Sequence, residues 1–151
     1  MFRAEARFPG RPGHGVAEIA IAAANQDWES AEREARTRLG EPSTDTDTAL
    51  EGVETLADIR LTQGRLSDAE RDLKRVVASG TRPGGAGRAL SAAVRLAYLE
   101  LRYRRSPAAA VSTMSSALRQ YPLAKMPEAE RPYDEVARLF ADAGQPARAH
   151  E

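Results

Sequence analysis

One short pattern recurs four times along the chain, and it constrains the fold more than any other feature. In each copy a turn-like segment is followed by an alanine that opens an apolar stripe. The four alanines are Ala31, Ala69, Ala110 and Ala149, so the intervals between them are 38, 41 and 39 residues. A steady period near forty residues, with two apolar-periodic segments in each unit, is typical of an array of helical hairpins.

The segments before each turn have the periodicity of amphipathic helices. Apolar side chains recur at intervals of three and four, as at Val53, Leu56 and Ala57. This spacing places them on one face of a helix. No segment alternates between apolar and polar residues in the manner of a strand, so the sequence predicts an all-α protein.

Several polar residues and glycines predict where individual helices begin and end. Capping boxes that start at Thr48 and Ser67 predict two helix starts, and Ser106 before Pro107 predicts a third. Gly80 follows a second helix, where a left-handed stop residue is expected.

Residues 56–77, LADIRLTQGRLSDAERDLKRVV, resemble a tetratricopeptide repeat. In this resemblance Leu56 and Ala57 belong to the first helix. Gly64 is the turn glycine, and Ala69 is the small residue of the second helix. Small residues at these positions would let paired helices approach closely.

Residues 96–122 match the same pattern, except that they lack the turn glycine and have a turn one residue longer. The resemblance covers most of residues 16–151. It implies a right-handed superhelical stack of helix–turn–helix hairpins, which is an α-solenoid.

The expected organisation is a flexible N-terminal arm at residues 1–15 followed by one helical repeat domain at 16–151. The expected hairpins are 16–40, 48–79, 89–121 and 132–151, the last of them incomplete. A short second helix in the last hairpin would leave Tyr133, Val136, Leu139 and Phe140 partly uncovered. Two explanations remain open: the chain is a piece of a longer protein, or this end meets another chain.

The composition argues against catalysis. The chain has no cysteine, and its two histidines, His14 and His150, lie near opposite ends. The glycine-rich segment 79–88 lacks the Gly-Lys-Ser/Thr ending of a phosphate-binding loop, so we interpret it as a flexible joint. We therefore expect no catalytic residues, no cofactor and no metal, and we do not expect an enzyme.

Charge and hydropathy bear on whether the protein binds nucleic acid or enters a membrane. The formal net charge is zero, so no general attraction to nucleic acid is expected. No run approaches the roughly 20 apolar residues that a membrane-spanning helix needs, and the first residues do not form a secretory signal. A cytoplasmic protein is expected.

The charges are unevenly distributed along the chain. Residues 81–125 contain eight basic residues and one acidic residue, whereas 41–80 contain nine acidic and five basic residues. Residues 126–151 contain six acidic and three basic residues. Two interpretations remain open: neighbouring repeats attract one another and fix their stacking, or the basic segment binds an acidic or phosphate-bearing partner.

The tetratricopeptide resemblance implies a ligand groove on a concave face lined by the first helices of the hairpins. Arg95, Tyr98 and Arg102 are three and four residues apart and share a helix face. The predicted partner-binding residues are Arg95, Tyr98, Arg102, Glu54, Asp58 and Arg138. In this prediction Arg95 and Arg102 pair with carboxylates of the partner, Tyr98 supplies apolar contact, and the acidic residues receive a basic side chain.

The predicted function is therefore non-catalytic binding of a peptide or protein partner, and an acidic partner is one option. One alternative is a structural module that forms homo-oligomers through its C-terminal hairpin. Another is the C-terminal regulatory repeat region of a larger bacterial signalling protein.

Overall fold

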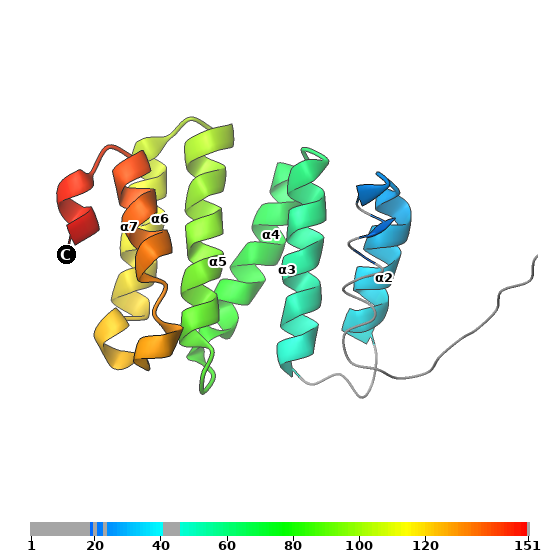
Figure 1. The fold of residues 1–151 in the computed structure, drawn as a ribbon, viewed down its shortest axis with the longest axis horizontal. Helices are drawn as coiled ribbons and strands as arrows, with labels where there is room; N and C mark the ends of the chain where they lie inside the picture. The colour runs from blue at the N-terminus through cyan, green and yellow to red at the C-terminus, as the bar shows by residue number, and fades with distance from the viewer. Residues whose placement is uncertain (1–18, 20, 23, 41–45, 151) are drawn as a thin grey trace, which may run out of the picture. The chain divides into compact units, whose positions relative to one another are not determined.

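The computed structural model describes residues 19, 21, 22, 24–40 and 46–150 (Figure 1). In this part of the chain the backbone forms helices and turns and contains no strand, which confirms the all-α prediction. The predicted arm at 1–15 lies outside the described residues, as does most of the first helix of hairpin 16–40.

The α-helices of the described residues vary in length from ten to seventeen residues. They are α2 (Trp28–Gly40), α3 (Thr46–Thr62), α4 (Leu66–Ala78), α5 (Ala86–Tyr98), α6 (Pro107–Gln120) and α7 (Tyr133–Asp142). The shorter helical segments are η1 (Ser79–Thr81), η2 (Leu99–Tyr103), η3 (Leu123–Lys125), η4 (Glu128–Glu130) and η5 (Pro146–His150). The segment η2 is a π-helix that continues α5, and the others are 3-10 helices.

The chain divides into two units, Met1–Gly52 and Val53–Glu151, and the boundary falls inside α3. In the first unit, α2 begins where the Asp27 carboxylate accepts a hydrogen bond from the backbone N–H of Ser30 at 3.1 Å. Such a bond satisfies one of the backbone donors left free at a helix start. Ala31 and Ala35 lie on the buried side of this helix.

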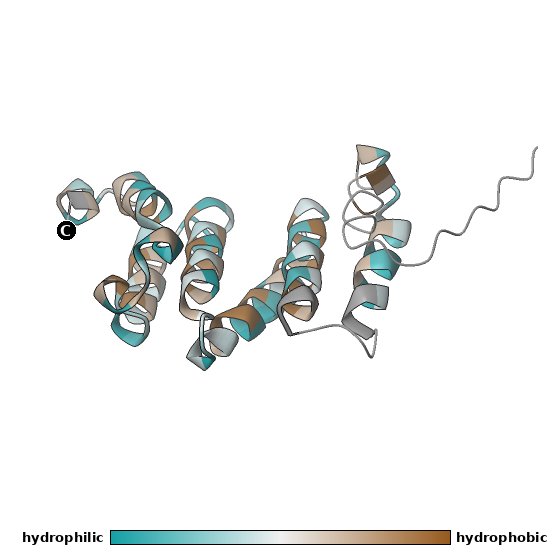
Figure 2. Cartoon of the chain, turned by 60° about the horizontal axis from the view of Figure 1, so that its bottom comes forward, coloured by the Kyte–Doolittle hydropathy of each residue, from teal (hydrophilic) through white to brown (hydrophobic). Residues whose placement is uncertain are grey.

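In the second unit α5 is the central helix, and it packs against α4, α6 and α7 (Figure 1). Close packing is possible because its buried side is rich in alanine. Its fully or almost fully buried residues include Ala89, Ala93 and Ala97, and those of α6 include Ala110 and Met114. Figure 2 shows that the helices of this unit carry both apolar and polar positions, as the amphipathic pattern predicts.

The turns between paired helices share one backbone feature. In the described part of the chain, a residue with positive φ lies five positions before each of the four recurring alanines. These residues are Gln26 (φ 60°), Gly64 (73°), Arg105 (53°) and Gly144 (77°). The repeat predicted from the alanines therefore recurs in the geometry of the turns.

Hydrogen bonds close these turns in a common way. The backbone N–H of Arg65 donates to the carbonyl of Arg60 at 2.8 Å, and that of Gln145 donates to Phe140 at 2.8 Å. Both bonds span five residues. This is the pattern of a helix that ends through a left-handed glycine.

The third turn contains one more residue, as predicted. Here the N–H of Ser106 donates to the carbonyl of Glu100 at 3.0 Å, so the bond spans six residues. The extra residue is accommodated by the wider π-helical winding of η2, where Arg104 N–H donates to Leu99 at 3.3 Å. Arg105 takes the left-handed position that glycine takes in two of the other turns.

Helix starts agree with the sequence at one of three predicted sites. Ser106 caps α6, with its hydroxyl accepting from the N–H of Ala109 at 3.4 Å and Pro107 in the first turn. The capping box at Ser67 is wrong, because the Gly64 turn already starts α4 at Leu66 with Arg65 as the cap residue. The box at Thr48 is wrong as well, because α3 begins at Thr46.

Gly80 does not stop a helix by a left-handed conformation, so that prediction is wrong. It lies in η1 at a close approach between segments. A Cβ atom at Gly80 would lie 2.4 Å from the Cβ of Ala89 and 2.7 Å from the ring of Tyr121, so only glycine fits without a shift. The helix α5 also begins at Ala86, three residues before the predicted hairpin boundary, which shortens the expected joint.

The C-terminal end is better covered than predicted. Val136, Leu139 and Phe140 are buried, so the expectation that they are partly bare is wrong, whereas Tyr133 is exposed as expected. They belong to the apolar core that α7 shares with α5 and α6, and η5 packs back onto α7 after the turn at Gly144. The Arg148 guanidinium lies 4.6 Å from the centre of the Phe140 ring, and Ala149 packs against the core.

Candidate functional site

Polar and aromatic side chains from three helices meet on one surface of the second unit. We call this surface the α3–α5–α7 face. Its residues are Glu54 and Asp58 from α3, Arg95 and Tyr98 from α5, Arg102 from η2, and Glu135, Arg138 and Asp142 from α7. Within α7 the last three are spaced by three and four residues, so they share one side of that helix.

Arg95 links α5 to α3. Its guanidinium forms an ion pair with the Asp58 carboxylate and donates to the backbone carbonyl of Glu54 at 3.4 Å. Burial lowers the pKa of Arg95, and the negative charges of Glu54 and Glu135 act in the opposite direction. Arg95 is therefore engaged by the protein's own carboxylates.

Tyr98 lies near the other end of the face, one helical turn further along α5. Its hydroxyl donates to Oδ2 of Asp142 at 2.9 Å, and the Arg102 guanidinium lies 4.6 Å from the centre of its ring. The same guanidinium lies 4.0 Å from Oδ2 of Asp142. Burial, followed by the hydrogen bond to Asp142, raises the pKa of Tyr98, whereas the charges of Arg102 and Arg138 lower it.

The structure brings the six predicted site residues onto this face. Arg95 contacts Asp58 and the backbone of Glu54, and Arg102 stacks on Tyr98. Arg138 is close enough for its charge to act on Tyr98. Asp142 was missed, although it follows Arg138 by four residues on an amphipathic helix and so lies on the same side.

Ion pairs also connect the basic segment 81–125 to its acidic neighbours. Arg95 pairs with Asp58 in α3, and Arg104 pairs with Glu70 in α4. These contacts support the interpretation that opposite charges hold adjacent helices together. They leave fewer of the basic side chains for a partner than the sequence count implies.

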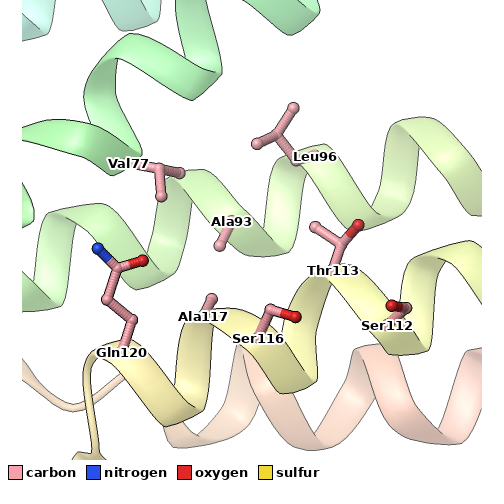
Figure 3. Close-up of a pocket in the computed structure, with 8 residues that line it drawn as sticks. All are labelled: Val77, Ala93, Leu96, Ser112, Thr113, Ser116, Ala117 and Gln120. Atoms are coloured by element: carbon pink, nitrogen blue, oxygen red, sulfur yellow. The ribbon is translucent and has the colours of Figure 1, made fainter.

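A separate pocket of about 310 Å³ lies between α4, α5 and α6 (Figure 3). Its lining residues are Val77, Ala93, Leu96, Ser112, Thr113, Ser116, Ala117 and Gln120. The groups from α4 and α5 are apolar, whereas α6 contributes the hydroxyls and the amide together with Ala117. The spacing of three and four between hydroxyl residues of α6 could have revealed this polar side. The volume is at the small end for a ligand pocket.

The described residues contain no group of three or more His, Cys, Asp or Glu side chains placed to hold a metal ion. Within the same residues, no helix combines the length and the apolar character needed to cross a membrane.

The fold and the face together define an all-α protein with a recurring helix–turn geometry and a charged surface around one tyrosine. No protein-family model matches the chain, and the searches of curated proteins and of solved structures also gave no match. The tetratricopeptide resemblance therefore stays a prediction.

Proposed function

We propose that the chain binds a peptide or protein partner on the α3–α5–α7 face and catalyses no reaction there. The observation that carries this proposal is the convergence of side chains from three helices on one accessible surface. The side chains of Asp58, Arg102 and Asp142 are 61%, 67% and 43% exposed, and the last two contact Tyr98. Accessible charges beside an aromatic ring are suited to recognising a polypeptide.

A tetratricopeptide-like stack and a cytoplasmic location are parts of the same proposal. The stack is supported by the left-handed turn residue that precedes each recurring alanine by five positions. In such a stack the first helices of successive hairpins, here α3, α5 and α7, would line the binding surface.

The geometry favours different roles for the three arginines of the face. Arg95 is a positioning residue, because it joins α5 to Asp58 and to the Glu54 backbone. Arg102 and Arg138 are the exposed cations, and they would contact the partner together with Tyr98. A charge reversal at Arg95 would place a carboxylate beside Asp58 and would test folding rather than binding.

Selection of displayed random peptides tests this function. The parent chain would be compared with Arg102→Glu, which reverses a charge on the face. Arg75→Glu is the matched control, because it makes the same change at an exposed position of α4, a helix that contributes no residue to the face.

We expect peptides to be enriched on the parent chain and on Arg75→Glu, and to be lost on Arg102→Glu. Enrichment that survives Arg102→Glu but disappears when Ser116→Arg fills the pocket between α4, α5 and α6 would place binding in the pocket and refute the proposal. Absence of enrichment on the parent would count against it as well.

A further inference from the structure

The end of the face around Tyr98 already holds a carboxylate, and that carboxylate belongs to the protein. Oδ2 of Asp142 accepts the hydrogen bond of the Tyr98 hydroxyl at 2.9 Å and lies 4.0 Å from the Arg102 guanidinium. Arg102 in turn stacks on the Tyr98 ring at 4.6 Å. A neutral donor and a stacked cation thus converge on a single carboxylate oxygen.

Asp142 is poorly placed for the stability of its own helix. It is the last residue of α7, where the aligned carbonyl dipoles favour a cation and disfavour an anion. Its side chain is also 43% exposed, so water can replace the contacts that it makes. These features allow Asp142 to leave Tyr98 at little cost.

The charges around Tyr98 leave room for a carboxylate from outside. The positive charges of Arg102 and Arg138 and the negative charge of Asp142 all act on Tyr98, so two positive charges and one negative charge act there. An incoming carboxylate would meet a net attraction once Asp142 has moved away.

We propose that Tyr98 and Arg102 form a carboxylate-binding site that Asp142 occupies when no partner is present. An aspartate or glutamate side chain of the partner peptide takes the place of Asp142, accepts the Tyr98 hydrogen bond and pairs with Arg102. This inference rests on the proposed peptide-binding function and identifies the partner as an acidic segment. Asp142 acts as an internal competitor that weakens binding of that segment.

The test is an NMR titration with a defined probe. The probe is a short peptide of alternating alanine and glutamate, blocked at both ends, and its counterpart carries glutamine in place of glutamate. The full chain would be compared with Asp142→Asn, which keeps an acceptor for the Tyr98 hydroxyl and removes the charge. Asp134→Asn is the matched control, because it removes one exposed negative charge from the same helix.

We expect the glutamate probe to shift the Tyr98 ring signals and to bind Asp142→Asn roughly three- to tenfold more tightly than the parent, the size expected from the net contribution of one ordinary hydrogen bond. Asp134→Asn should change the affinity much less. Arg102→Gln should abolish the Tyr98 shifts, and the glutamine probe should not bind. Thermal melting of each variant would establish that it is folded.

Three results would overturn the inference: equal affinity of the Asp142→Asn and Asp134→Asn variants, equal binding of the two probes, or no shift at Tyr98 in any variant. The proposed function can survive such a result. Random selection that yields Arg102-dependent peptides without acidic residues would keep the peptide-binding face and remove the carboxylate site. If neither the peptide selection nor the NMR titration detects binding, both the proposed function and the carboxylate site are refuted.

Discussion

Arg105 adopts a backbone conformation that suits glycine better than a residue with a side chain. Its φ is 53°, and in the corresponding turns Gly64 and Gly144 have values of 73° and 77°. A side chain in this left-handed region costs about 1–2 kcal/mol, because Cβ approaches the following carbonyl oxygen. Glycine avoids that cost but loses more backbone entropy on folding.

We therefore expect Arg105→Gly to stabilise the folded chain by about 0.5–1 kcal/mol, measured by urea denaturation. Arg105→Ala removes the same charge and keeps the strain, so it should have little effect. Gly64→Ala should destabilise by about 0.5–1 kcal/mol by the same balance, and since nothing lies within 4 Å of a Cβ there, the cost would come from the backbone alone. Equal stability of the glycine and alanine variants at 105 would show that the turn is not strained.

At the level of elements, Glu70 ties α4 to the end of η2. Its carboxylate accepts a hydrogen bond from Nζ of Lys74 at 2.6 Å and pairs with Arg104, which also bonds Glu100 at 2.6 Å. These hydrogen bonds, that of Lys74 first, hold the pKa of Glu70 below its ordinary value of 4.5. The carboxylate is therefore more acidic in the folded chain than in the unfolded chain.

This shift predicts a loss of stability in acid. A carboxyl group whose pKa is lowered by folding contributes its full stabilisation above its unfolded value, and loses it as the pH falls through the lower folded value. We expect Glu70→Gln to reduce the free energy of unfolding at about pH 6, and the gap between variant and parent to close towards about pH 3.

Denaturant melts of the parent and of Glu70→Gln across this pH range would measure the effect. Glu128→Gln, which removes an exposed carboxylate of η4, is the control. A gap for Glu70→Gln that stays constant with pH would contradict the proposed coupling.

Local patterns predicted some elements and missed others for physical reasons. The helices and the longer third turn follow from periodicity and from the absence of glycine at 105. The π-helix η2 does not, because its extra residue could equally have lengthened the loop. Gly80 was misread because its role depends on Ala89 and Tyr121, which are distant in the sequence. Such close approaches have no local signature.

At the scale of the whole molecule, the features that could not be predicted from the sequence are contacts between residues far apart in the chain. The shared face of Arg95, Tyr98 and Arg102 was predictable from helical spacing alone. The pairing of Arg95 with Asp58 was not, because opposite charges on two helices do not reveal which pairs form. Burial of Phe140 was missed for a similar reason, since it depends on the path of η5 after Gly144.

The burial of Val136, Leu139 and Phe140 bears on self-association. The alternative of a homo-oligomer through the C-terminal hairpin rests on uncovered apolar side chains, and of the four expected ones only Tyr133 is exposed. We expect light scattering to give the mass of one chain at all accessible concentrations. A larger mass that returns to that of one chain in Tyr133→Glu would instead favour self-association, because Tyr133 is 50% exposed at the start of α7.

The π-helical winding of η2 has a consequence for how such a chain can change over generations. An added residue in the third turn is taken up before Arg105, so Ala110 keeps the same distance from the turn as its counterparts. An insertion at this point therefore leaves the buried contacts between α5 and α6 unchanged. At this turn the chain can therefore gain or lose a residue, and change the surface there, without repacking its interior.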